Sequence, residues 1–152
     1  MPYSVTLVEG VQASSHRGVC FLESGSDGDV NGKAVFDGLK AKLRNDVLSR
    51  FDYWLGGGKQ DKYFHGWPGD RGYKWCFVFK WKEAGTYHRL YGFLFHLPTS
   101  SDPGFQVCVL VSHARKNSQN TDPSELEAVM RLRNKPEVIA AVKKAYAVHA
   151  KK

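Results

Sequence analysis

Cysteine is scarce in this sequence, and no two cysteines stand close together along the chain. Cys20, Cys76 and Cys108 lie far apart within apolar stretches, and no Cys-x-x-Cys pair occurs. An odd, scattered set is typical of buried thiols in a reducing compartment, and it does not suit a disulfide framework. We therefore expect neither disulfide bonds nor a metal site built on cysteine.

Long apolar runs are also missing. No stretch approaches the roughly 18 consecutive apolar residues of a membrane-spanning helix. The first residues, MPYSVTL, lack the charged and apolar regions of a signal peptide. We expect a cytoplasmic protein with no membrane partner.

The motifs of several enzyme classes are absent as well. The chain contains no HExxH, no GxSxG and no GK[ST], and the glycines of residues 56–73 do not follow the spacing of a phosphate-binding loop. The sequence therefore predicts no bound metal and no cofactor.

Acidic residues are outnumbered by basic ones. The chain carries 22 Lys and Arg against 15 Asp and Glu, which gives a formal net charge of +7. An excess of positive charge favours polyanionic partners, and nucleic acid is the first candidate. An acidic protein partner, or a solvated basic surface without a ligand, would also account for it.

The first half of the chain shows strand patterns followed by a helical one. Residues 3–9 alternate and are β-branched, and residues 18–23 resemble a second short strand. After a polar loop, apolar residues recur every three to four positions over residues 33–55, which predicts one amphipathic helix of about six turns. Asn31 is its expected N-cap, and Gly56 begins a glycine run that is expected to end it.

The second half predicts an antiparallel meander followed by helices. Residues 73–82, 86–96 and 105–113 alternate in the manner of strands, and alternation places His113 on the same face as Val109. The paired phenylalanines of the first two strands are expected to build the core. Asp122, Pro123 and Glu125 form a capping box, and Pro136 is expected to begin a second helix. A chain of this length suits one α+β domain, residues 1–152.

Basic and aromatic side chains gather toward one end of these three strands. Since adjacent strands lie about 4.8 Å apart, such side chains can converge within the span of one or two nucleotides. They would then form a phosphate clamp with platforms for base stacking. The set comprises Lys80, Lys82, Tyr87, His88, Arg89, Tyr91, His113, Arg115 and Lys116.

The order of these segments resembles a known family. TYHRLYGFLF, followed by FQVCVLVSHARKNSQNTDPSELEAVMRLR, is similar to the Tyr-Arg strand, basic-ended strand and acidic helix of RelE/HigB-type toxins and their phage-derived relatives. The resemblance covers residues 33–146, so residues 1–32 would be an additional strand and loop. It implies a RelE-like fold, with an N-terminal helix packed on a central antiparallel sheet and C-terminal helices.

The resemblance also implies an activity. Toxins of this kind are endoribonucleases that cleave mRNA, often on the ribosome, under the control of an antitoxin, here expected to be acidic. Cleavage uses the 2′-hydroxyl of the RNA as nucleophile and requires no metal. The protein must help remove the proton of that hydroxyl, stabilise the phosphorane and protonate the departing 5′-oxygen.

The resemblance also implies candidate site residues, matched position by position to the family's motif. Arg89 matches the Arg of the Tyr-Arg element and would bind the scissile phosphate, Arg115 and Lys116 match the basic pair, and Lys80 matches a basic residue of the preceding strand. Tyr91 and His113 are candidates for stacking or proton transfer. The expected catalytic residues are Arg89, Lys80, Lys116, Tyr91 and His113, and the expected RNA-binding residues are Lys82, Arg115, Tyr87 and His88.

Two alternatives remain. Val78-Phe79-Lys80 stands where relatives commonly have Glu-Leu-Arg, which suits an RNA or ribosome binder that keeps the fold without the chemistry. The basic face could instead dock an acidic, antitoxin-like protein. At single positions, Arg89 could be a strand-surface arginine paired with a carboxylate, and His113 could be structural.

Overall fold

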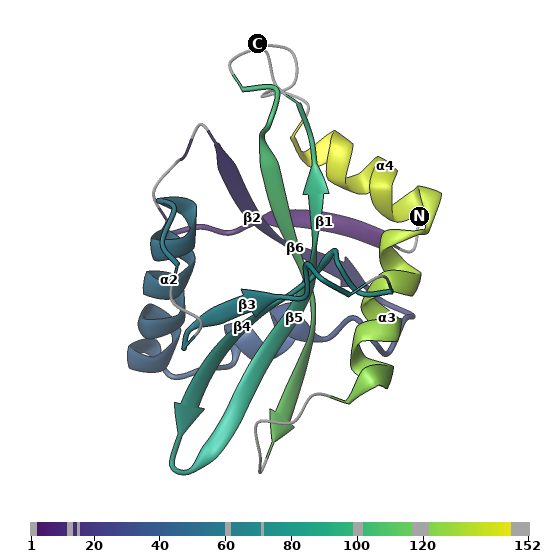
Figure 1. The fold of residues 1–152 in the computed structure, drawn as a ribbon. Coiled ribbons are helices and arrows are strands. Elements are labelled where there is room, and N and C mark those ends of the chain that lie inside the picture. Colours follow the sequence, from purple (N-terminus) through teal and green to yellow (C-terminus); the bar gives the residue numbers. More distant parts are fainter. Residues whose placement is uncertain are drawn as a thin grey trace.

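The computed structural model describes residues 3–11, 14, 16–59, 62–70, 72–98, 102–116 and 122–146, except the side chain of Lys116. Within these residues the chain forms one six-stranded sheet and four helices (Figure 1). The strands are β1 (Tyr3–Leu7), β2 (Arg17–Ser24), β3 (Phe64–Gly66), β4 (Cys76–Glu83), β5 (Thr86–His96) and β6 (Gln106–Lys116). The helices are α1 (Gly32–Asp37), α2 (Ala41–Leu55), α3 (Pro123–Arg133) and α4 (Pro136–Ala145).

The α+β class is confirmed, but the prediction of an antiparallel sheet is wrong in one respect. The strand order is β1-β2-β6-β5-β4-β3, and β2 pairs with β6 in parallel, whereas the other neighbouring pairs are antiparallel. The four residues 19–22 of β2 are buried, which suits a strand inside the sheet. The alternation of residues along a strand indicates which of them are buried, but it does not identify the strand with which it pairs. The parallel pairing of β2 with β6 therefore could not be predicted.

Helices cover both faces of the sheet. In Figure 1, α2 lies on one side of the strands and α3 and α4 on the other. Phe51 of α2 packs with Phe79 and Leu90 in one apolar cluster, and Val129 of α3 packs with Val78 in the other. Aromatic residues therefore serve mainly the core, as expected: Phe77, Phe79 and Phe93 are buried, and Phe95 is half-buried.

The predicted single helix over residues 33–55 is in fact two helices. The chain leaves α1 at Gly38 and enters α2 through Lys40, whose backbone is extended (φ −61°, ψ 149°). The Arg44 guanidinium donates to the carbonyls of Asp37 and Leu39, at 3.3 and 3.0 Å, which satisfies acceptors exposed at the break. The apolar spacing continues through both helices, so the sequence pattern does not reveal the interruption. Helix α2 ends at Leu55, before the glycine run, as predicted.

Asn31 precedes α1 but does not cap it with its side chain. Its Oδ1 instead accepts a hydrogen bond from the backbone N–H of His113 at 2.8 Å, and its own N–H donates to the carbonyl of Val111 at 3.1 Å. Asn31 thus fixes the start of α1 to strand β6.

An irregularity in β6 lies at the same place. The pairing passes from Tyr91 with Ser112 to Gly92 with Leu110, so Val111 has no partner of its own and forms a β-bulge. The bulge reverses the alternation of side chains. His113 therefore lies beside Leu90 on the α1/α2 face, and the prediction that it shares a face with Val109 is wrong.

Several boundaries agree with the sequence and others do not. β5 matches residues 86–96, the capping box of Asp122 and Glu125 is present, and α4 begins at Pro136. β4 begins three residues later than predicted, and β6 continues to Lys116. The three-residue strand β3 lies within the predicted loop and is too short to show a period. In the described part of the chain, no helix has the length and apolar character needed to span a membrane.

Candidate nucleic-acid interface

A basic groove borders the β4–β5 hairpin. We call it the hairpin groove, and its volume is about 650 Å³. Five of the residues that line it are cationic, four are aromatic or imidazole residues, and none of the described lining residues is acidic. The lining comprises Arg50, Lys62, Tyr63, Lys80, Trp81, Lys82, Tyr87, His88 and Arg89.

The groove lies where β4 extends past the end of β3. The last cross-strand pair of these two strands is Phe64 with Phe79, after which the Lys80 N–H donates to the carbonyl of Tyr63 at 2.7 Å. Among the described residues, no further strand covers this edge of β4. The remaining wall comes from α2, where the Arg50 guanidinium lies 4.8 Å from the centre of the Tyr63 ring. A ligand can therefore approach the hairpin from its open edge.

Five of the nine predicted site residues line this groove. Lys80 pairs with Arg89 across the strands, and Lys82 pairs with Tyr87. The ammonium of Lys82 lies 5.1 Å from the centre of the Tyr87 ring, a cation–π contact that holds charge and ring together. His88 lies between Tyr87 and Arg89 in the sequence and also borders the groove. The structure thus places cations, an aromatic ring and an imidazole along the same hairpin, at the border of one groove.

The buried side chain of Arg89 is hydrogen-bonded to a tyrosine. Only 3% of Arg89 is exposed, and its Nη1 donates to the hydroxyl of Tyr91 at 3.2 Å. That hydroxyl donates to Oε1 of Glu125, also at 3.2 Å, and the same oxygen accepts the N–H of Asp122 in the capping box of α3. Tyr91 is fully buried, so its position suits orienting Arg89 and does not suit stacking against a base. Arg89 is thus connected to the Glu125 carboxylate through the Tyr91 hydroxyl.

Two histidines form a pair on the other side of the hairpin. Nδ1 of His88 lies 2.9 Å from Nε2 of His113, and the indole of Trp81 stacks on His88 with ring centres 5.2 Å apart. Burial lowers the pKa of both imidazoles, and the charge of Arg115 lowers them further, so that the pKa of His113 falls to about 4. Both rings are therefore neutral near pH 7, with one N–H shared between them. A neutral imidazole at the groove can accept a proton.

The nine predicted residues do not all converge on one point. Cross-strand register places Lys80, Lys82, Tyr87, Arg89 and Tyr91 toward the α3/α4 face, whereas His88, His113 and Arg115 lie toward the α1/α2 face. The two sets border each other only along the hairpin. The backbone of Lys116 pairs with Tyr87, and its side chain lies outside the described residues.

Sequence reasoning missed four lining residues. Arg50 comes from α2, Lys62 and Tyr63 come from the connection before β3, and Trp81 lies in β4. Nothing in local periodicity joins α2 to the hairpin. The buried Nε1 of Trp81 and the buried Nε of Arg50 have no hydrogen-bond partner among the described residues.

The described residues contain no group of three or more His, Cys, Asp and Glu side chains arranged to hold a metal ion. Comparison with known proteins finds no matching family model, no matching curated protein and no matching solved structure.

Proposed function

We propose that this chain is a cytoplasmic, RelE/HigB-like toxin that binds mRNA in the hairpin groove and cleaves it without a metal. The observation that carries the proposal is the composition of the groove: its described lining residues include five cationic side chains and no acidic one, with aromatic rings and a neutral histidine beside them. Cationic grooves lined by aromatic residues are the common way in which proteins hold single-stranded nucleic acid. A groove of this charge would also attract an acidic antitoxin segment.

The cations would hold the scissile phosphate. Lys80, Lys82 and Arg89 border the same stretch of the groove. In this proposal Arg89, positioned by Tyr91, binds the phosphate, and the two lysines offset the charge that develops on the phosphorane. Tyr87, next to Lys82, would stack on a neighbouring base.

The histidine pair would carry the proton. His88 borders the groove and accepts the proton of the 2′-hydroxyl as the 2′-oxygen attacks phosphorus, and His113 shares the resulting positive charge. The bond from phosphorus to the 5′-oxygen breaks, and the departing oxygen takes a proton from the ammonium group of Lys82. The products are a 2′,3′-cyclic phosphate and a free 5′-hydroxyl.

Induced expression in a bacterial host tests the proposal. Wild type should stop growth and cut transcripts, whereas Arg89→Ala and Lys82→Ala should do both much more weakly, because each removes a cation from the groove. Lys143→Ala serves as the control, since Lys143 is exposed on α4 and does not line the groove. Because Arg89 is buried, the amount of soluble Arg89→Ala protein must be measured, and exposed Lys82 provides the variant that is safe for folding. Unchanged growth and intact transcripts with soluble wild type present would refute the proposal.

A second candidate is an RNA or ribosome binder without cleavage. The burial of Arg89 and the separation of the histidines from the lysines favour this alternative. Such a protein would bind single-stranded RNA with a strong dependence on salt and leave it intact.

A further inference from the structure

The strand at the far edge of the sheet from the hairpin groove has an open side. β1 (purple in Figure 1) is the first strand in the order β1-β2-β6-β5-β4-β3, and among the described residues no strand pairs with its outer side. Its five residues, Tyr3–Leu7, include no charged residue, proline or glycine, and their pairing with β2 shows no register shift. Proteins usually protect an edge strand with charges, proline, a bulge or a very short length. The other edge strand, β3, has only three residues, whereas β1 has none of these protections.

The pairing of β1 with β2 determines which of its backbone groups face outward. The N–H of Val8, the residue after β1, donates to the carbonyl of Val19 of β2 at 3.3 Å. Hydrogen-bonded and non-hydrogen-bonded pairs alternate along an antiparallel ladder, so the even-numbered residues of β1 direct their N–H and C=O groups toward β2. Tyr3, Val5 and Leu7 therefore direct theirs away from the sheet, where a further strand could pair with them.

A groove lies between β1 and helix α4, which packs against this strand. We call it the edge groove, and its volume is about 430 Å³. Residues 3–5 of β1 line it on one side, and four residues of α4 line it on the other: Ala140, Ala141, Lys144 and Ala145. Because three of the four are alanines, the groove has room for a larger side chain. At the end of β1, Leu7 is 40% exposed, so the same strand carries an exposed apolar side chain and borders an apolar groove.

The outer side of β1 is complementary to itself. Two copies placed antiparallel about a two-fold axis at Val5 would pair Val5 with its own copy and Leu7 with Tyr3 of the second chain. The three outward-facing residues would then all form hydrogen-bonded pairs. On the other face, Ser4 would stand opposite Thr6 of the second chain, a favourable pair of hydroxyl side chains. Leu7 of each copy would thus reach the edge groove of the other beside Tyr3.

Charge and size also favour a second copy as the occupant. The chain has a formal net charge of +7, so two copies meet most readily where neither presents a charge to the other. β1 carries no charge, and the long side chain of Lys144 can keep its ammonium group in water at the rim of the groove. A contact of two five-residue strands and their grooves belongs at the low end of interface sizes, near or below about 1,200 Å². The dimer should therefore be reversible, with a dissociation constant in roughly the micromolar range.

We propose that the outer side of β1 is a dimerisation surface, at which two copies of this chain join their sheets into one continuous sheet. Such an isologous two-fold contact is the commonest arrangement of soluble homo-oligomers. The inference does not rest on the proposed function, because the hairpin groove borders β4 and β5 near the opposite edge of the sheet. Each dimer would carry two hairpin grooves, both distant from the contact.

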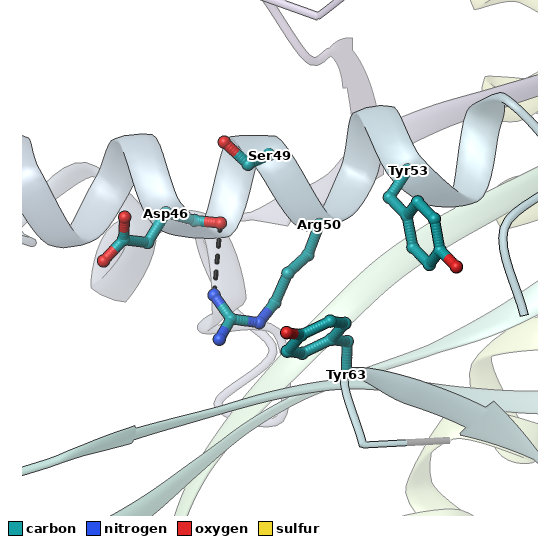
Figure 2. Close-up of a pocket in the computed structure, with 5 residues that line it drawn as sticks. All are labelled: Asp46, Ser49, Arg50, Tyr53 and Tyr63. Atoms are coloured by element: carbon teal, nitrogen blue, oxygen red, sulfur yellow. Dashed lines mark hydrogen bonds between the residues drawn. The ribbon is translucent and has the colours of Figure 1, made fainter. Parts of the chain in front are cut away.

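Analytical ultracentrifugation tests the association. Between about 1 and about 200 μM protein, which spans the expected dissociation constant, the average mass of wild type should rise from the 17.1 kDa of one chain toward twice that value. Leu7→Lys should keep the mass of one chain, because it removes the side chain that reaches the edge groove and places a charge there. Tyr53→Lys changes an exposed aromatic residue on α2 instead (Figure 2) and should associate as wild type does. Wild type that keeps the mass of one chain throughout, or Leu7→Lys that associates normally, would overturn the proposal.

Cysteine cross-linking tests the register. The double variant Ser4→Cys with Thr6→Cys places cysteines opposite each other across the two-fold axis, in a non-hydrogen-bonded pair whose Cβ atoms lie about 4.5 Å apart. Oxidation should join two chains of this variant covalently, whereas neither single variant should cross-link to the same extent. The three native cysteines are buried and should not compete. Thermal melting checks that the variants fold. A folded double variant that forms no more covalent dimer than the single variants, at concentrations where wild type associates, would overturn the pairing of β1 with its copy.

Discussion

At the scale of single residues, the pairing of β4 with β5 brings five side chains to one groove: Lys80, Lys82, Tyr87, His88 and Arg89. Their positions follow from simple pairing across a hairpin, which the sequence of β4 and β5 predicts. The partners behind them depend on tertiary contacts. The hydrogen bond from Arg89 to Tyr91 and the pairing of His88 with His113 could not be derived from alternation alone.

The histidine pair makes stability depend on pH. Because the pKa of His113 is lowered from 6.5 to about 4 in the folded chain, the unfolded chain binds more protons between these values. Stability should therefore fall as the pH falls through this range. We expect wild type to lose roughly 1–2 kcal/mol of unfolding free energy between pH 7 and pH 5 through this residue.

Urea denaturation of His113→Gln measures that contribution. The variant removes the titrating group, so its stability should depend less on pH than that of wild type over the same interval. His96→Gln, on an exposed histidine outside the pair, should keep the wild-type dependence. Identical pH profiles for wild type and His113→Gln would show that the pair does not titrate as inferred.

At the scale of elements, the β6 bulge determines which side chains reach the histidine pair. It turns His113 toward Trp81 and His88, and Asn31 holds it in place through two hydrogen bonds. Gly92 stands opposite the bulge in β5, and an added Cβ there would lie 2.3 Å from the backbone carbonyl oxygen of Val109. The close approach of two central strands at this point requires glycine.

Replacement of this glycine should be costly. Gly92→Ala places a methyl group against a backbone atom that cannot move aside, so we expect a loss of roughly 3 kcal/mol or more in unfolding free energy. Gly69→Ala is the matched control, because an added Cβ at position 69 meets nothing within 4 Å. Chemical denaturation of both variants measures the difference. A Gly92→Ala protein as stable as Gly69→Ala would contradict the strand geometry at the bulge.

Elements with strong local signals were predictable. β5 has eleven alternating residues, and α3 begins with a capping box and a proline, so both were located from the sequence. The break between α1 and α2, the bulge in β6 and the parallel pairing of β2 with β6 leave no local trace. The bulge and the parallel pairing arise because distant segments satisfy one another's hydrogen bonds. At the helix break, the Arg44 side chain satisfies the carbonyls of Asp37 and Leu39, which apolar spacing does not reveal.

At the scale of the whole molecule, the helices leave one part of the sheet open. α1 and α2 cover one face and α3 and α4 the other, while the turn end of the β4–β5 hairpin extends past α2 and α3 (Figure 1). The hairpin groove lies along this open part and carries five of the 22 basic residues of the chain. Part of the excess positive charge of the sequence is thus concentrated in the hairpin groove.

The central claim is that this groove cleaves RNA without a metal. The most direct measurement is incubation of purified protein with single-stranded RNA in excess EDTA, followed by analysis of the product ends. We expect cleavage products with 2′,3′-cyclic phosphate and 5′-hydroxyl ends from wild type and from Lys143→Ala, and at least tenfold slower cleavage by Lys82→Ala, as is typical when a cationic group that stabilises the transition state is lost. RNA that binds to the wild-type protein and stays intact in this assay, with and without added divalent metal, would contradict the claim.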